Sequence, residues 1–164
     1  MREILFRGKR TDTGEWVEGN LVWIKNIEGQ PYQCFIISQL SYLEYGEFDE
    51  MYQVFPETIG QFTGLTDKNS KRIFEGDILK VQTRVYVEED NPVFGKMKAQ
   101  SEEKRTRYWV VEWGNQTCGG ASWYFYGKDR RFNRRASKST LWNSEAEVVG
   151  NIHDNPELMM EVEV

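Results

Sequence analysis

Residues 54–81 of this 164-residue chain, VFPETIGQFTGLTDKNSKRIFEGDILKV, constrain the fold more than any other stretch. The central residues, Thr66–Lys71, are turn formers, because Asp and Asn side chains accept hydrogen bonds from nearby backbone N–H groups. The flanking residues, 58–65 and 72–74, are too short and too rich in Gly, Thr and β-branched or aromatic residues to favour a helix. This pattern predicts a β-hairpin.

A long strand is expected after the hairpin. Leu79, Val81, Val85 and Val87 alternate with polar residues, and a period of two places the aliphatic side chains on one face of a half-buried strand. Gly76, between two acidic residues, predicts a bulge or tight bend where this strand begins.

The same stretch resembles the hallmark segment of the YopX-like family, whose members are encoded in bacteriophages and prophages. Residues 148–158, VVGNIHDNPEL, are similar to the closing motif of that family, and residues 4–10, ILFRGKR, match its start more weakly. Ser70 stands where the family commonly has a glycine, and His153–Asp154 replaces an aromatic–acidic pair. The resemblance implies a mainly β protein with an SH3-like barrel in its C-terminal part, and it implies no activity.

Composition indicates an ordered protein whose net charge is unlike that of a general nucleic-acid binder. Nine Phe, eight Tyr and six Trp are too many for a disordered chain, whereas a net charge of −5 leaves no basic footprint over the whole molecule. No apolar run is long enough to span a bilayer or to act as a signal segment, so we expect a cytoplasmic protein in a bacterial host, without a membrane partner. Cys34 and Cys118 should then stay reduced.

The order of predicted elements suggests two parts with a boundary near Phe55. Residues 1–54 read as an N-terminal β-meander, and residues 55–164 would then form the SH3-like barrel that the resemblance implies. The meander consists of strands 4–10, 16–25 and 32–38, with Gly14 in its first turn and a loop or single helical turn at 41–51. The second part contains a long mobile loop at 88–104, strands at 107–113, 121–126 and 145–152, a loop at 128–138, and a short C-terminal helix from Pro156.

The best candidate for a binding site lies in the loop at 128–138. Four arginines within six residues, next to an aromatic ring, suit phosphate contacts and base stacking, although a merely solvated loop has the same composition. The candidate residues are Lys128, Arg130, Arg131, Phe132, Arg134 and Arg135. Their partner would be nucleic acid or an acidic protein surface.

A dense aromatic set in two neighbouring strands is a second candidate surface. Most of these rings should pack in the core, and any that face outward would form a platform for a partner or for another copy of the protein. The set comprises Trp109, Trp113, Trp123, Tyr124 and Tyr126.

Enzymatic and metal sites are weakly indicated. Glu57, Glu75 and Asp77 would have to converge in one cleft to support a metal-dependent hydrolase, and we expect them instead to face water or cap backbone N–H groups. His153 is the only histidine and is expected at the surface, and the residues from Asp67 onward lack the glycine and glutamate of a calcium loop. We therefore expect no metal, cofactor or catalytic residue, and favour a non-enzymatic binding module over an assembly protein that self-associates.

Overall fold

The computed structural model describes residues 3–25, 33–38, 50–91, 93, 95–116, 120–127, 133–137, 140–141 and 145–160. These residues form β-strands and two short 3₁₀-helices, η1 (Pro56–Thr58) and η2 (Pro156–Met159), which confirms a mainly β protein. No helix in the described part of the chain is long and apolar enough to cross a membrane. The chain divides into two compact units that alternate along the sequence: Met1–Leu65 with Arg72–Gly76, and Thr66–Lys71 with Asp77–Val164.

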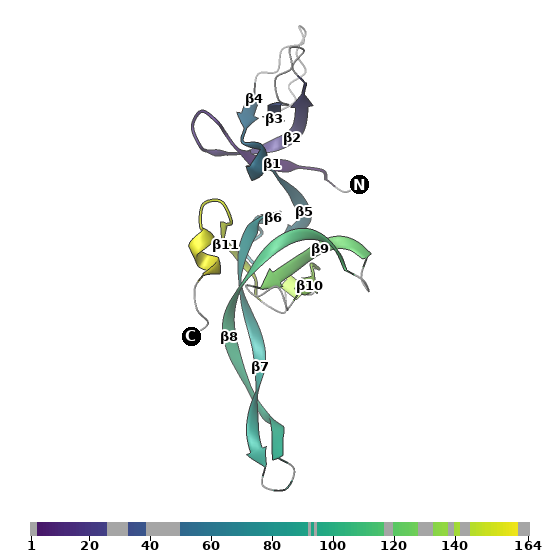
Figure 1. Cartoon of the computed structure of the whole chain (residues 1–164), viewed down its shortest axis with the longest axis vertical. Coiled ribbons are helices and arrows are strands. Elements are labelled where there is room, and N and C mark those ends of the chain that lie inside the picture. The colour runs from purple at the N-terminus through teal and green to yellow at the C-terminus, as the bar shows by residue number, and fades with distance from the viewer. Residues whose placement is uncertain are drawn as a thin grey trace. The chain divides into compact units, whose positions relative to one another are not determined.

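The first unit contains a six-stranded antiparallel sheet with the strand order β4-β3-β2-β1-β5-β6 (Figure 1). Its strands are β1 (Phe6–Lys9), β2 (Trp16–Ile24), β3 (Gln33–Ile37), β4 (Met51–Val54), β5 (Gly60–Thr66) and β6 (Arg72–Phe74). The predicted three-strand meander is confirmed, and β4, which follows the predicted loop at 41–51, extends it. Most of that loop lies outside the described residues.

The core of this unit forms where the meander strands pack closely. Cys34, Ile36 and Val54 are buried, and partly buried apolar residues of β1 and β2 pack against them. Gly19 allows this packing, because a Cβ atom there would lie 2.0 Å from the carbonyl oxygen of Ile37. Gly14 takes a positive φ of 73° in the first turn, as predicted.

The second unit contains a five-stranded sheet with the order β10-β9-β8-β7-β11, and every described pairing in it is antiparallel. Its strands are β7 (Asp77–Asn91), β8 (Gly95–Gln116), β9 (Gly120–Gly127), β10 (Asn133–Arg135) and β11 (Glu147–Asn151). The order is linear, and the described strands do not close into a barrel. The predicted SH3-like barrel is therefore not confirmed, because alternation identifies strands but not whether the two edge strands meet.

The longest feature of this unit is a two-stranded arm, which we call the β7–β8 arm and define as residues 82–91 and 95–106. β11 pairs with β7 only from Asp77 to Lys80, and β9 pairs with β8 only from Trp109 onward. Beyond those points β7 and β8 pair with each other as far as Asn91 and Gly95, and they continue together past the rest of the sheet (Figure 1). The predicted mobile loop at 88–104 is thus wrong. Its polar sequence forms two strands that pair with each other.

The predicted hairpin is β5–β6, and its turn belongs to the second unit. The side chain of Asp67 organises this turn: Oδ1 accepts hydrogen bonds from the N–H groups of Asn69 (2.8 Å) and Lys71 (2.9 Å), and Oδ2 accepts one from Val148 N–H (3.0 Å). Ser70 takes the left-handed φ of 65°. The hallmark segment and the closing motif of the sequence are therefore hydrogen-bonded to each other.

The last described element is η2, and the predicted short helix is therefore a 3₁₀-helix. Pro156 occupies its first turn as expected, but no side chain caps its N-terminus. Asn151 performs a related task one turn earlier, because its Oδ1 accepts hydrogen bonds from the N–H groups of His153 and Asp154, both at 2.9 Å.

Candidate functional site

The predicted basic loop is described only in part. Lys128, Arg130, Arg131 and Phe132 lie outside the described residues. Arg134 and Arg135 belong to β10, where they pair with Phe125 and Tyr124 of β9. The loop expected to reach residue 138 therefore contains an edge strand. Asn and Arg have little preference for strands, so β10 depends on the edge that β9 offers.

A second group of basic residues lies where the β7–β8 arm leaves the sheet, and sequence reasoning missed it. Its members are Lys80, Arg84, Lys104, Arg105 and Arg107, and the segments 80–84 and 104–107 contain no acidic residue. The register pairs Lys80 with Tyr108, Arg84 with Lys104, and Val81 with Arg107. The signal was present in the sequence, but it emerges only when segments twenty residues apart are paired.

The sheet topology brings both ends of the predicted loop to the end of the sheet where the second basic group lies. Gly127, which precedes the predicted loop, pairs with Trp109, only two residues from Arg107. Asn133, which follows it, pairs with Tyr126, and Tyr126 pairs in turn with Val110. Both ends of the loop therefore attach beside the root of the arm. We call the two groups together the basic cluster.

The basic cluster differs sharply in charge from the rest of the chain. It holds ten of the 21 Lys and Arg residues and one acidic residue, Asp129, for a net charge of +9. The remaining chain then holds 11 basic and 25 acidic residues, a net charge of −14. Part of this positive charge is neutralised by an acidic residue outside the cluster, because Glu145 forms a 3.0 Å salt bridge with Lys104.

The cations at the root of the arm occupy both faces of the ribbon. Side chains alternate across a strand, so Lys80, Arg84 and Lys104 share one face, and Arg105 and Arg107 share the other. Arg84, Lys104 and Arg105 are exposed, and Arg107 is half-buried. A polar ladder continues between them, with Gln82 Nε2 donating to Thr106 Oγ1 at 3.1 Å. This arrangement offers positive charge to a partner on either side of the ribbon.

Most of the predicted aromatic surface is core. Trp109, Trp123 and Tyr124 are buried and Tyr126 is half-buried, while Trp109 stacks on Phe125 with ring centroids 5.7 Å apart. Trp113 alone of the five predicted aromatics is largely exposed, at 51%, and its ring meets the edge of Trp123 at 5.0 Å. The prediction that most of these rings pack is confirmed, and the outward platform is reduced to Trp113.

The three predicted carboxylates have different environments. Glu57 is exposed in η1 and Glu75 is half-buried before Gly76, whereas Asp77 is 1% exposed at the start of β7. Of the two predicted alternatives, facing water is excluded for Asp77. Among the described residues, no three His, Cys, Asp or Glu side chains come close enough together to hold a metal ion. The convergence that a metal-dependent hydrolase needs is not seen in this part of the chain.

The remaining candidates have structural surroundings. His153 is exposed, as predicted. Cys34 is buried in the core of the first unit, and this burial raises the pKa of its thiol, which disfavours the reactive thiolate. Cys118 lies outside the described residues.

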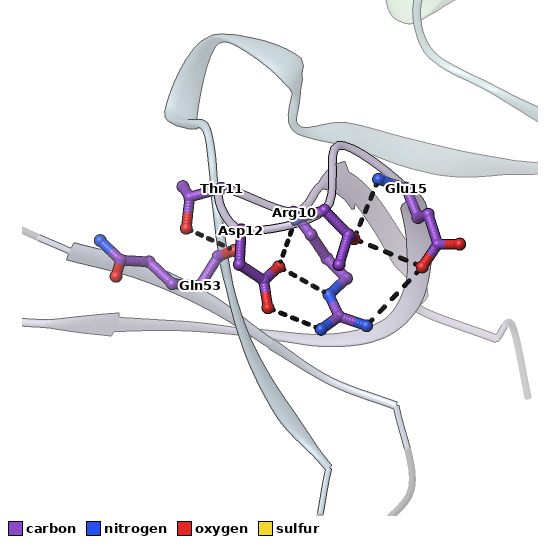
Figure 2. Close-up of polar contacts among 6 residues, drawn as sticks. Arg10, Thr11, Asp12, Glu15 and Gln53 are labelled. Atoms are coloured by element: carbon purple, nitrogen blue, oxygen red, sulfur yellow. Dashed lines mark hydrogen bonds and ion pairs between the residues drawn. The ribbon is translucent and has the colours of Figure 1, made fainter.

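Basic residues of the first unit are matched by acids and rings of their own unit. Figure 2 shows Arg10 with its guanidinium 2.7 Å from Asp12 and 3.9 Å from Glu15, inside the turn that Thr11 ties to Gln53. The hydrogen bond from Arg10 is the largest cause of the lowered pKa of Asp12. Arg7 lies between the rings of Trp16 (4.8 Å) and Phe74 (5.1 Å). The contacts of Arg7 and Arg10 thus lie within the first unit.

A solved structure resembles this chain over nearly its full length. The crystal structure of protein EF1440 from Enterococcus faecalis aligns with a TM-score of 0.52 and 24% sequence identity, covering 97% of this chain and 99% of that one. At this identity the likeness shows the fold alone. The chain matches none of the curated proteins. The family model described as YopX protein matches residues 5–160, almost the whole length, so the chain belongs to the YopX family.

Proposed function

We propose that this protein is a non-enzymatic module that binds nucleic acid through the basic cluster, in the cytoplasm of a bacterial cell that carries the phage or prophage encoding it. The observation that supports the proposal is the placement of both ends of the basic loop beside the root of the β7–β8 arm. This placement concentrates a charge of +9 in a chain whose overall charge is −5.

The shape of the arm suits a nucleic-acid groove. The major groove of B-DNA, about 12 Å wide, admits a two-stranded β-ribbon. The cations lie at the root of the arm, on both faces of the ribbon, whereas residues 85–103 hold five acidic and two basic residues. The root, rather than the outer half, would contact the phosphates on both sides of such a groove. The loop cations would add contacts to the backbone, and Phe132 would supply a ring for stacking on an unpaired base. The acidic remainder of the chain would limit binding to this one surface.

Salt-dependent binding to short single- and double-stranded DNA and RNA tests the proposal. The logarithm of the affinity should fall linearly with the logarithm of the salt concentration, with a slope of about −0.7 to −0.9 for each phosphate contact. A variant with Arg130, Arg131, Arg134 and Arg135 changed to Ala should lose most binding, and Lys80→Ala with Arg105→Ala should reduce both the affinity and the slope.

Matched control variants distinguish binding through the basic cluster from an effect of the net charge of the protein. Lys25→Ala with Lys71→Ala removes the same charge as the second variant at two exposed positions outside the cluster, and should leave binding nearly unchanged. Equal loss in both double variants would show that only net charge matters. Failure of the parent protein to bind at low salt would overturn the proposal, and binding to an acidic protein partner would then be the alternative to pursue.

A further inference from the structure

The outer edge of β7 in the arm has no described partner strand. β11 covers β7 only from Asp77 to Lys80, and from Gln82 to Asn91 the only strand paired with β7 is β8. An uncovered strand edge presents a row of backbone N–H and C=O groups that another strand can pair with. Ten residues at about 3.4 Å each give an edge roughly 34 Å long. A ribbon of only two strands is also marginally stable by itself, so a partner strand would add support.

The outer edge of β8 is less suited to pairing. The register passes from Tyr86↔Glu102 to Glu88↔Lys98, so one residue of β7 lies opposite three residues of β8, at positions 99–101. Such a bulge interrupts the edge that contains the extra residues and is one way proteins protect an edge strand. β7 has no extra residue there, and its edge is continuous.

The order of basic, apolar and acidic residues along β7 favours a second copy of the same strand as the partner. β7 reads Arg84, then the apolar run Val85-Tyr86-Val87, then the acidic run Glu88-Glu89-Asp90. If two copies of this strand pair antiparallel about Tyr86, the apolar runs meet, because Val85 of each copy lies opposite Val87 of the other. Arg84 of each copy then lies opposite the acidic run of the other. Parallel pairing would instead set acid against acid.

From this pattern we infer that the β7 edge of the arm pairs antiparallel with the β7 edge of a second copy of this chain, about a two-fold axis at Tyr86. Such a contact is isologous, so it closes as a dimer and uses the same surface on both copies. The inference does not depend on nucleic-acid binding, although Arg84 belongs to both surfaces and the two interactions would compete there.

A charge exchange tests the pairing in the full-length protein without nucleic acid. Arg84→Glu makes the β7 edge acidic at both ends. A second variant makes it basic at both ends by changing Glu88, Glu89 and Asp90 to Lys. That variant also changes Lys96 and Lys98 to Glu, because these residues lie opposite Asp90 and Glu88 within the arm and would otherwise repel the new lysines.

Sedimentation velocity at low salt should show a concentration-dependent dimer for the parent protein. Each variant alone should dimerise about tenfold more weakly or worse, since like charges then face each other across the two-fold axis. An equimolar mixture should form a heterodimer, because both ends of that pair are again complementary. A monomeric parent at all concentrations, or a mixture no tighter than its components, would overturn the inference.

Cross-linking of single-cysteine variants tests the register of the proposed strand pairing independently of the charge exchange. In a background with Cys118→Ser, oxidation should cross-link Tyr86→Cys to the same residue of the second copy, because residue 86 lies opposite itself across the axis, within disulfide distance. Thr83→Cys and Asn91→Cys should stay monomeric. Equal cross-linking along the whole strand would indicate parallel pairing, and none at residue 86 would contradict the assigned axis. Equal urea midpoints for the variants would show that each is folded.

Discussion

The turn of the β5–β6 hairpin and the outer half of the β7–β8 hairpin both have polar sequences, yet they are held in opposite ways. The turn of β5–β6 is anchored to a distant segment: Asp67 accepts the N–H of Val148, and Lys68 N–H donates to the carbonyl oxygen of Ala146 at 3.0 Å. The outer half of β7–β8 pairs only with itself among the described strands. The β5–β6 turn is hydrogen-bonded within the second unit, and the outer half of β7–β8 extends from the sheet of that unit.

This difference shows that polar composition alone does not distinguish a turn that is hydrogen-bonded to the rest of its unit from a segment that pairs only with itself. In β5–β6 a single carboxylate, 7% exposed, satisfies three backbone N–H groups that would otherwise lack partners. In the arm, charged residues of both signs lie on two strands that pair, among the described strands, only with each other. Stability should therefore depend strongly on the first hairpin and little on the second.

Asp67→Ala should have the largest effect on this comparison. The substitution leaves the buried N–H of Val148 and two turn N–H groups without their acceptor, and should lower the free energy of unfolding by roughly 3 kcal/mol. Urea unfolding followed by tryptophan fluorescence measures it. Asp67→Asn should lose less, because the amide oxygen can still accept bonds within the turn.

The matched control is Asp12→Ala, which removes an exposed turn carboxylate from the first unit. Its urea midpoint should stay close to that of the parent protein, since the lost contacts are open to solvent. If both changes had the same small effect, the anchoring role of Asp67 would be wrong, and the two hairpins would not differ as described.

Ser70→Gly should have a smaller effect of opposite sign. Ser70 holds a φ of 65°, a conformation that costs a residue with a Cβ atom about 1 kcal/mol and costs glycine almost nothing. After the entropy cost of a more flexible unfolded chain, we expect a gain of about 0.5 kcal/mol in the same urea measurement. Ser70→Val should destabilise, and a stabilising valine would show that the turn is not strained.

The first hairpin was predictable because its signals are local. Turn residues at Thr66–Lys71 and short flanking strands define β5–β6 without knowledge of the rest of the fold. The bond from Val148 to Asp67 was not predictable, since it joins residues 81 positions apart. The burial of Asp77 was missed for a similar reason, because the pattern around Gly76 shows a bend but not what covers it.

The arm was missed because a strand is recognised by the alternation of polar and apolar residues, and residues 88–104 do not show this alternation. Residues 88–104 are charged on both sides of each strand, which is typical of a loop as well as of a free ribbon. Only half of the basic cluster could be predicted from the sequence. Its loop is one continuous run, whereas Arg84 and Lys104 become neighbours only through the register of β7 and β8.

Glu147→Gln should have a still smaller effect, visible as a change in pH dependence. The hydrogen bond with Lys68 is the largest cause of the lowered pKa of Glu147, whose ordinary value is 4.5. A carboxylate with a depressed folded-state pKa stabilises the fold above its unfolded-state pKa, and this contribution is lost as the pH falls through the folded value. The parent should therefore lose more stability below about pH 4.5 than Glu147→Gln does.

Urea midpoints at neutral and acidic pH, each at low and high salt, measure this difference. Both partners are substantially exposed, so added salt should shrink the gap between the two proteins. Identical pH profiles would show that the Lys68–Glu147 pair does not help to hold the β5–β6 turn against β11.

Shortening the arm should have the smallest effect on stability. Arg84 pairs with Lys104, so residues 85–103 can be replaced by Asn-Gly, which forms the type I′ turn that suits a two-residue hairpin loop. The sheet residues below this point are unchanged, and the free energy of unfolding should stay within about 0.5 kcal/mol of the parent value, because no described strand other than β7 and β8 pairs with the removed segment. The shortened protein should also remain monomeric where the parent dimerises. A large loss of stability would show that the arm supports the sheet, and would make the two hairpins alike.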